Sequence, residues 1–520
     1  MYNGILHVAT LGRSVRIRVL EQLQSVSDAP AGHLYKFYTY RYLNHMTDNN
    51  NTIDASATAP NKPPKRTDPT SLGTLPIGKL LMEYSIPAII ASVAVSVYNI
   101  VDSIFIGRGV GPMAIAGLAI TLPLMNLVMA FCTLIAAGGA TISSIFLGQK
   151  NVSRATDVIN NVMTFCVIHG VVFGGVTLIF IDPILRFFGA TPETIDYARE
   201  FMEVILYMMP VSYVFIGLNN LMRATGYPKK AMISALLSVV VNVALAPLFI
   251  YTFHWGIAGA AWATNAGQFV AFIWVLNHFF SKKSYVHFNA SNSWFNGSIL
   301  KKIYEIGLSP FLMNVCACVV VVFLNKALLD YGGADGNLAI GAFGIMNRTT
   351  MFFVMVVFGV TQGMQPILGF NYGANQWARV KDTLYKGIWI GAGITSLGCF
   401  LTEVFPDEIS RLFTVDESLI AIAREGFRVY FICYPVVGCQ IVIQNFFQSI
   451  GKPQISIFLS LTRQLIFLLP FLLLLPRYFG VEGVWMSMAG SDLLAFIVAV
   501  ITMVIMLSRQ ERILKRMGPV

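Results

Sequence analysis

Long apolar segments separated by short polar loops dominate this chain. From residue 80 onward, apolar runs of about 20–30 residues recur with few charges inside them. A helix needs about 20 such residues to cross a bilayer, and only helices and closed barrels satisfy their backbone hydrogen bonds there. The runs are too long and too uniformly apolar to be barrel strands. The sequence therefore predicts an all-α integral membrane protein.

The apolar runs predict twelve transmembrane helices. Composition agrees, because 56% of the residues are hydrophobic and 12% are charged, whereas soluble proteins carry about 25% charged residues. The predicted spans are 80–105, 114–147, 156–180, 196–221, 230–251, 257–280, 302–328, 338–370, 380–404, 418–446, 454–475 and 482–507.

The net charge of +10 does not indicate a nucleic-acid partner, because Lys and Arg lie in short clusters between apolar runs and not on one polar face. The seven cysteines fall inside apolar runs, without the spacing to His that a metal site requires. The sequence contains no phosphate-binding GxxxxGK[ST], no HExxH and no GxSxG. We expect a protein that is not an enzyme, has no cofactor and draws its energy from an ion gradient.

Residues 1–75 differ from the rest of the chain. Residues 47–74 are rich in Asn, Thr, Pro and Lys and lack apolar periodicity, which predicts a disordered tail. Residues 1–45 have neither the apolar core of a signal peptide nor a helix long enough to span. One hypothesis is that translation begins at Met46; an intact mass that includes Met1 would exclude it. We expect no function in this extension.

Loop charge predicts the orientation, since cytoplasmic loops carry an excess of Lys and Arg. One set of loops and the C-terminal tail hold Lys150, Arg154, Arg223, Lys229, Lys230, Lys282, Lys283, Lys301, Lys302, Arg379, Lys381, Lys386, Lys452, Arg509, Arg512, Lys515 and Arg516. The alternate loops hold Asp182, Glu193, Asp196, Asp330, Asp335, Asp407, Glu408, Asp416 and Glu417. Both termini are therefore expected in the cytoplasm.

The spans form two repeats that superpose at an offset of about 221–225 residues. The matches are Pro87 with Pro310, Leu147–Gly148 with Leu368–Gly369, Ala198–Arg199–Glu200 with Ala423–Arg424–Glu425, Pro210 with Pro435, Asn220 with Asn445, Gly226-x-Pro228 with Gly451-x-Pro453, Gly256-x-x-Gly259 with Gly480-x-x-Gly483 and Ala271–Phe272–Ile273 with Ala495–Phe496–Ile497. Six spans per repeat give both halves the same orientation, related by an axis along the membrane normal.

The duplication predicts two parallel-related six-helix bundles. They comprise residues 76–285 and 300–508, joined by a cytoplasmic loop at 286–299 and followed by a basic tail at 509–520. Such an architecture places a substrate cavity between the halves, and rocking of one half against the other gives alternating access.

Five segments carry a family resemblance: YNIVDSIFIGRGVG (98–111), RATGYPKK (223–230), WGIAGAAWAT (255–264), QGMQPILGFNYGA (362–374) and SLTRQLIFLLP (460–470). With them, residues 75–510 resemble the multidrug and toxic compound extrusion (MATE) family, in its bacterial DinF-like branch. The resemblance implies efflux of drug-like organic compounds, often cationic and amphipathic, driven by an inward H⁺ or Na⁺ gradient. It also implies a multi-pass protein of the bacterial cytoplasmic (inner) membrane, and we expect a monomer in the bilayer.

Asp102 is the main candidate for ion coupling. A carboxylate inside a spanning helix costs about 2.5–3.5 kcal/mol and therefore usually faces a cavity. Tyr98 and Asn99 precede it by four and three residues, which places them on the same helical face. Alternatively, Asp102 lies close enough to the external end to reach water. The segment YNIVD matches the aspartate motif of the family's first helix.

Asn242 is the second candidate. The resemblance implies a VNIxLDP-like pattern here, with a second carboxylate one turn after the Asn. This chain reads VNVALAP, so Ala246 stands where that acid would be. Asp102 and Asn242 are the candidate ligands of a Na⁺ ion, since one carboxylate with neutral oxygens still binds Na⁺ or takes up a proton. An interhelical hydrogen bond is the alternative for Asn242.

The second half differs in its chemistry. Asn325 falls where Asp102 does, and Lys326 follows it. Arg348 and Arg463 are cations at membrane depth that need partners, and Asp492 is one candidate partner for Arg463.

Two glutamines and a histidine complete the set of candidates. Gln362 and Gln365 line the substrate cavity together with the polar residues of the second half, or they pack between helices. His169 is either a proton relay or a packed residue with one hydrogen bond, and we favour packing.

Three functions compete. The leading prediction is an ion-coupled exporter of amphipathic organic compounds. A flippase for lipid-linked precursors would be expected to hold a pyrophosphate with several cations in its central cavity, whereas the first half offers an acid. A membrane enzyme is disfavoured because no His, Asp or Ser cluster lies at one face of the membrane.

Overall fold

The structure is a computed structural model that describes residues 69–282, 284–333 and 336–517. The hypothesis that Met46 is the first residue lies outside the described residues. The predicted extension reached residue 75, but its last part differs from the prediction, because Ser71–Thr74 form a short helix, α4. The buried side chain of Leu72 anchors this helix.

The first half of the membrane region consists of helices α5 to α12, with a π-helical turn, η1, near its end. Their bounds are α5 Ile77–Gly109, α6 Pro112–Gly148, α7 Val152–Ile179, α8 Ile181–Phe187, α9 Ile195–Tyr207, α10 Met209–Ala224, α11 Pro228–Pro247, η1 Leu248–Thr252 and α12 Gly256–Phe280.

The second half consists of helices α13 to α21, with a 3₁₀ turn, η3, and a π-helical turn, η4. Their bounds are α13 Gly297–Tyr331, α14 Gly336–Gly373, α15 Trp377–Val404, α16 Pro406–Arg411, α17 Glu417–Tyr430, η3 Phe431–Cys433, α18 Tyr434–Ser449, α19 Pro453–Leu461, η4 Thr462–Leu468, α20 Leu469–Leu474 and α21 Pro476–Met517.

The span count agrees with the sequence. The described residues contain ten helices long and apolar enough to cross a membrane, and the pair α9–α10, bent by 58°, makes an eleventh. Helix α12 has 25 residues, or about 37 Å, and completes the twelve. It is less apolar because it carries Asn265, Gln268, Asn277 and His278.

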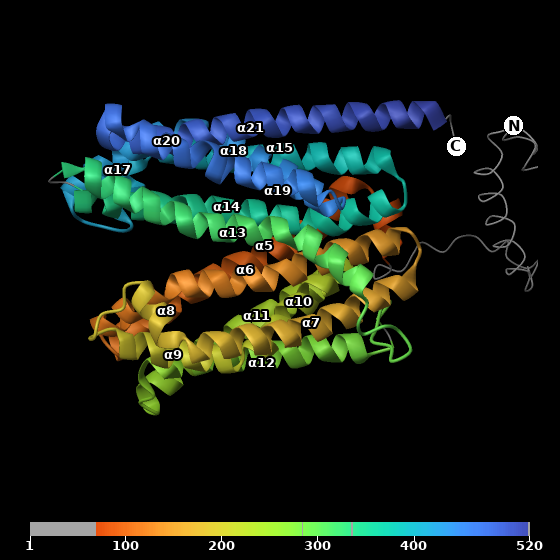
Figure 1. The fold of residues 1–520 in the computed structure, drawn as a ribbon, viewed down its shortest axis with the longest axis horizontal. Helices are drawn as coiled ribbons and strands as arrows, with labels where there is room; N and C mark the ends of the chain where they lie inside the picture. Colours follow the sequence, from red (N-terminus) through yellow and green to blue (C-terminus); the bar gives the residue numbers. More distant parts are fainter. Residues whose placement is uncertain (1–68, 283, 334–335, 518–520) are drawn as a thin grey trace, which may run out of the picture. The chain divides into compact units, whose positions relative to one another are not determined.

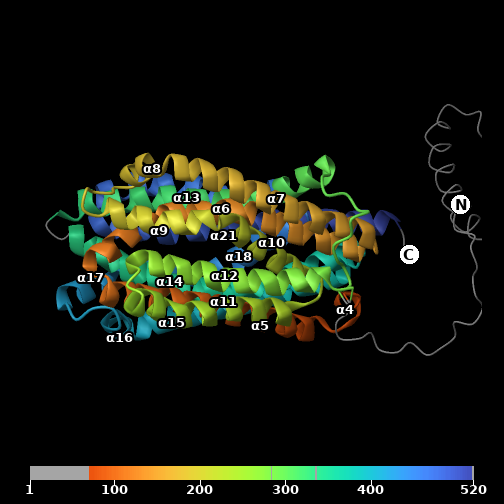
Figure 2. The ribbon, with the colours of Figure 1, turned by 90° about the horizontal axis from the view of Figure 1, so that it is seen from below.

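The twelve spans form two bundles, as predicted. Figure 1 shows α5–α12 gathered on one side and α13–α21 on the other, and Figure 2 shows the same helices running along a common direction. The bundles meet where α6 packs against α13 and α5 packs against α14.

The duplication extends to individual contacts. Two interactions between helices occur in both halves at offsets of 225–226 residues. They are the bidentate ion pairs Arg199–Asp182 and Arg424–Asp407, and the amide-to-hydroxyl bonds Asn219–Ser234 and Gln444–Ser460. The repeated sequence therefore encodes a repeated scaffold.

Glycines bring the two bundles into backbone contact. A Cβ atom added at Gly307 of α13 would lie 1.7 Å from the carbonyl oxygen of Leu134 on α6. One added at Gly363 of α14 would lie 2.4 Å from Oγ of Ser85 on α5. Small residues at these positions allow close approach of membrane helices.

The connection between the halves is anchored to the first half. Asn160 and Asn161 of α7 donate hydrogen bonds to the carbonyl oxygens of Asn289 and Ser293, both at 3.0 Å. The loop after α12 therefore packs on the end of α7, and α13 begins from a fixed position.

Candidate functional site

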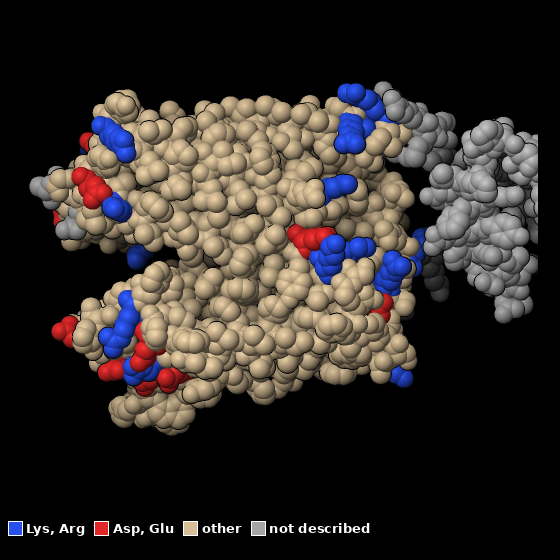
Figure 3. Space-filling model, in the orientation of Figure 1, with Lys and Arg blue, Asp and Glu red and all other residues tan. Residues whose placement is uncertain are grey.

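A hollow separates the two bundles at one end of the molecule. Figure 3 shows it opening at the end that carries α8 in Figure 1 and α16 in Figure 2, here called the α8 end. The opposite end, here called the α4 end, is closed by close contacts between residues 134–148 of α6 and the second half. Among the described residues, the two bundles thus separate at the α8 end and are in close contact at the α4 end.

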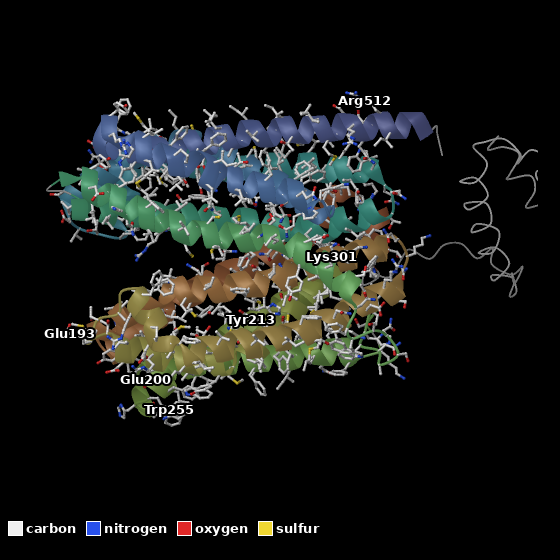
Figure 4. All side chains as sticks on the ribbon, viewed as in Figure 1. Glu193, Glu200, Tyr213, Trp255, Lys301 and Arg512 are labelled. Carbon is white, nitrogen blue, oxygen red and sulfur yellow. The ribbon has the colours of Figure 1, made fainter. Side chains whose placement is uncertain are left out.

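The two ends differ in charge. The surface between them carries almost no Lys, Arg, Asp or Glu in the view of Figure 3. In Figure 4, Glu193 and Glu200 lie at the α8 end, whereas Lys301 and Arg512 lie at the α4 end. Lys and Arg lie at both ends in Figure 3, and at the α8 end Arg199 and Arg424 are paired with the acids Asp182 and Asp407. An uncharged belt between two charged ends is typical of a membrane protein, whose side with unpaired basic residues faces the cytoplasm.

Asp102 is buried within the first half. Its side chain is 8% exposed, and its Oδ1 atom has no hydrogen-bond partner among the described residues. Tyr98 is half-buried and Asn99 is exposed. The structure therefore does not place Asp102 in water at the helix end, which was the alternative prediction.

Asn242 also lies in the interior of the first half. It is 3% exposed, and its Nδ2 donates to Oγ1 of Thr264 on α12 at 2.9 Å. Ala246, which replaces the second acid, is fully buried. Helices α5 and α11 pack against each other, but no hydrogen bond joins Asp102 to Asn242 in the described part of the chain.

The donor set for a metal ion is sparse. In residues 69–517, apart from the three that are not described, no three His, Cys, Asp or Glu side chains gather into a cluster. A Na⁺ ion at Asp102 would therefore depend on neutral oxygens, such as those of Tyr98, Asn99 and Asn242. These residues fit a proton equally well.

The second half carries a buried ion pair that the sequence suggested. Nε of Arg463 donates to Oδ1 of Asp492 at 2.5 Å, and the Asp492 side chain is 3% exposed. Arg463 lies in the π-helical turn η4, a type of turn that is frequent at functional sites. The sequence reasoning missed Gln440, whose buried amide has no partner within the described region; its only signal is a polar residue inside an apolar span.

The other candidates of the second half are more accessible. Asn325 is half-buried, and Lys326 and Arg348 are exposed. Arg348 was predicted as a cation at membrane depth that needs a partner; its side chain is exposed on the surface of the protein, and the need for a partner stays a prediction. Among the described residues, neither Asn325 nor Arg348 donates a hydrogen bond to the buried Oδ1 atom of Asp102.

The predicted cavity glutamines lie at the seam between the halves. Gln362 of α14 accepts a hydrogen bond from Arg223 of α10. Gln365 donates to Oγ1 of Thr141 on α6 at 2.8 Å. His169 of α7 lies 3.0 Å from the hydroxyl of Tyr304 on α13 through its Nε2 atom, which agrees with a packed histidine.

An apolar groove of about 450 Å³ lies between α5 and α11, away from Asp102. It is lined by Ile89, Ile90, Val93, Ala94, Val97 and Val239. Helical spacing places these residues of α5 on the side opposite Asp102, next to the exposed stripe that includes Ile86 and Ile104. The groove is thus not part of the site around the buried acid.

Known proteins and a family profile match both halves of this chain. The profile of the MatE family matches residues 87–248 and 306–474. The multidrug export protein MepA of Staphylococcus haemolyticus (strain JCSC1435) is 27% identical over 422 residues, which are 81% of this chain and 92% of that protein. MepA of Staphylococcus aureus (strain NCTC 8325 / PS 47) is 27% identical over 440 residues, with coverage of 84% and 95%.

Solved structures share the fold. One is described as the "Outward-facing conformation of a multidrug resistance MATE family transporter of the MOP superfamily"; it has a TM-score of 0.80 and 24% identity, and the match covers 86% of this chain and 99% of that chain. A second, from Pyrococcus furiosus, is described by "Reverse polarity of binding pocket suggests different function of a MOP superfamily transporter". It has a TM-score of 0.79 and 25% identity, with coverage of 85% and 99%.

Proposed function

This chain belongs to the MATE family of multidrug efflux transporters, and we propose that it exports amphipathic, cationic organic compounds in exchange for H⁺ or Na⁺ by alternating access. The observation that carries the proposal is the buried carboxylate of Asp102, whose Oδ1 has no hydrogen-bond partner in the described region. A buried acceptor without a partner is costly, and a proton or a cation removes that cost.

The orientation follows from the charges at the two ends. The basic α4 end faces the cytoplasm, and both termini lie there. The hollow at the α8 end then opens to the outside, so this conformation faces outward. The membrane is the bacterial cytoplasmic membrane, in which the protein acts as a monomer.

Coupling proceeds through the first half. The outward-facing hollow admits H⁺ or Na⁺ to Asp102, with Tyr98, Asn99 and Asn242 as neutral neighbours. Neutralising the acid removes its preference for a polar surrounding, so that α5 packs more closely in the first half. This change releases the drug, and the empty transporter then returns to the inward-facing state.

The substrate cavity lies between the halves. Asn325, Arg348 and Arg463 contribute polar groups from the second half. Gln362 and Gln365 have their amides hydrogen-bonded across the seam in this conformation, so they contact a substrate only after the α4 end opens.

A flippase or exporter of a lipid-linked or other endogenous precursor is the second candidate. The exposed side chains of Lys326 and Arg348 favour it, since cations bind phosphate groups. Competition discriminates the two: inorganic pyrophosphate should inhibit a flippase and leave the efflux of an organic cation unchanged.

The test uses purified full-length protein in proteoliposomes. Efflux of ethidium and of a fluoroquinolone is measured with Na⁺ and H⁺ gradients imposed separately. Asp102→Asn should abolish gradient-driven efflux because the amide binds neither ion as the carboxylate does. Asp330→Asn, at the exposed end of α13, is the matched control and should retain it. Undiminished gradient-driven efflux in Asp102→Asn would remove this residue from the mechanism, and transport that requires ATP would exclude a secondary transporter.

A further inference from the structure

Two of the family-like segments meet across the seam at the α4 end. Arg223 lies in the last turn of α10 in the first half, and Gln362 belongs to α14 in the second half. The guanidinium of Arg223 donates from one nitrogen to Oε1 of Gln362 and from the other to Oδ1 of Asn219, the latter at 3.0 Å. Because Asn219 is on α10 as well, Arg223 is oriented from its own helix towards the other half.

The segment that leads into α5 is bound to the second half. Nη2 of Arg379 on α15 donates to the carbonyl oxygens of Leu72 and Leu75 at 2.9 and 2.6 Å. Asn371 of α14 donates to the same Leu72 carbonyl at 3.0 Å and accepts from Nε of Arg379 at 2.9 Å. Residues 69–76, here called the strap, therefore begin the first half but are held by the second.

The strap also touches the first half. Pro69 lies beside Gly226, where a Cβ atom would be 3.5 Å from the proline ring. Gly226 follows Arg223 in the segment 223–230, so both features gather where α10 ends. The strap thus contacts both halves, the first half at Gly226 and the second at Arg379 and Asn371.

The strap's position depends on these contacts. A helix of four residues such as α4 is not stable alone, because nucleation is unfavourable and its carbonyl groups have no partners within the helix. Arg379 supplies those partners with a planar fork of donors that Lys cannot reproduce. Leu72 is fully buried and fixes the strap laterally.

We propose that the strap, clamped by Arg379 and Asn371, and the Arg223–Gln362 contact form a lock that keeps the α4 end closed. The proposal rests on the alternating access proposed above and identifies contacts that must break when the transporter turns inward. As long as Arg379 holds Leu72 and Leu75, the first half cannot move away from the second at this end. Weakening the clamp therefore shifts the population towards the state that is open at the α4 end and closed at the α8 end.

Hydrogen–deuterium exchange of the full-length protein in nanodiscs tests the lock without any substrate. In Arg379→Gln, exchange should rise about tenfold in peptides covering 69–76 and 223–230, as expected from the loss of one or two hydrogen bonds to a charged group. It should fall at 181–195 and 406–417, at the α8 end. Lys301→Gln is the matched control, because Lys301 is a cation at the same end (Figure 4) and pairs with Glu305 one turn away on its own helix, at 3.9 Å; its exchange should equal that of the wild type.

Asn371→Ala provides a second variant, which keeps the bonds from Arg379 to the two carbonyls. It should change exchange in the same directions with a smaller amplitude. Arg379→Lys should resemble Arg379→Gln, because it keeps the charge but loses the fork. A rise confined to 69–76, with unchanged exchange at the α8 end in both Arg379→Gln and Asn371→Ala, would make the strap a structural anchor and overturn the lock.

A cross-link tests the lock by the opposite change, because it fixes the strap to the second half and does not release it. A Cβ atom at Gly73 would lie 3.5 Å from the side chain of Gln376 and 2.9 Å from the ring of Phe370, which must shift slightly to admit it. None of the seven native cysteines is exposed. A short cleavable cross-linker between Gly73→Cys and Gln376→Cys should stop efflux, and cleavage should restore it. Full efflux by the cross-linked protein would overturn the lock. If the wild type transports none of the compounds tested, the proposed substrates are wrong, while the exchange experiment still decides the lock.

Discussion

At the scale of single residues, the two halves carry the same ion pair at the α8 end. Arg199 donates two hydrogen bonds to Asp182 at 2.6 and 2.7 Å, and Arg424 donates two to Asp407 at 2.6 Å. Each pair fixes a short helix, α8 or α16, to the span that follows it. The arginine hydrogen bonds hold the pKa of Asp182 and of Asp407 below the ordinary value.

The lowered pKa of these two acids gives stability a dependence on pH. Each ion pair contributes fully to the free energy of unfolding above the unfolded-state pKa of Asp, about 3.9. This contribution is lost as the pH falls through the lower folded-state pKa. The unfolding temperature of the wild type should therefore exceed that of Arg199→Gln at pH 6, and the difference should shrink as the pH approaches 3. Thermal unfolding in detergent measures it, with Arg424→Gln expected to give the same curve. A difference that stays constant down to pH 3 would contradict the role of the ion pair.

The sequence indicated which polar residues lie in the membrane, and for one of them it also indicated the partner. It proposed Asp492 as a partner of Arg463, and the structure brings the two together. It placed Arg348 at membrane depth but did not give the exposed face of α14 on which this residue lies, because hydropathy gives depth along the membrane normal and not the face of the helix. Gln440 was missed because an uncharged amide changes the character of an apolar run very little.

At the scale of elements, the sequence predicted the existence of the spans but not their breaks. Residues 196–221 were predicted as one helix, whereas the structure has α9 and α10 with a bend of 58°. Pro210 lies just after the bend and has no N–H to donate to the preceding turn. The equivalent Pro435 follows the 3₁₀ turn η3 in the second half. The matched prolines were visible in the sequence, but a proline alone does not determine how far a helix bends.

The seam between α6 and α13 should tolerate no side chain at Gly307. In an exposed helix, Gly→Ala stabilises by up to about 1 kcal/mol. At Gly307 the new Cβ would lie 1.7 Å from the Leu134 carbonyl oxygen, so we expect Gly307→Ala to destabilise by about 1–3 kcal/mol, as overpacking does. Gly393→Ala on α15 is the control, since nothing lies within 4 Å of its added Cβ. In detergent, the unfolding temperature of Gly393→Ala should be higher than that of Gly307→Ala. A lower unfolding temperature for Gly393→Ala would contradict the close contact at Gly307.

At the scale of the whole molecule, α5 and α14 are antiparallel and separate towards the hollow. At the closed end, Gly363 faces Ser85 and Gly359 faces Ile89. Further along, the hydroxyl of Ser96 contacts the sulfur of Met355. Ser103 lies seven residues after Ser96, and Arg348 lies seven residues before Met355, so both continue the facing sides of the two helices by two turns. The register thus places Arg348 opposite Ser103 at the open end.

Closing the α8 end should bring Ser103 and Arg348 together. We expect oxidative cross-linking between Ser103→Cys and Arg348→Cys to be slow in the outward-facing protein and to accelerate when Arg379→Gln is added. The pair Ser96→Cys and Met355→Cys is the matched control: these side chains touch now, so their cross-linking should be fast and should not accelerate. The rates are measured by the gel mobility of the intact chain. A rigid rocking motion of the two halves would bring Ser103 and Arg348 together along the same faces of α5 and α14 that already join Ser96 and Met355. If the Ser103–Arg348 cysteine pair never cross-links while the Ser96–Met355 cysteine pair does, α5 and α14 do not close in this way.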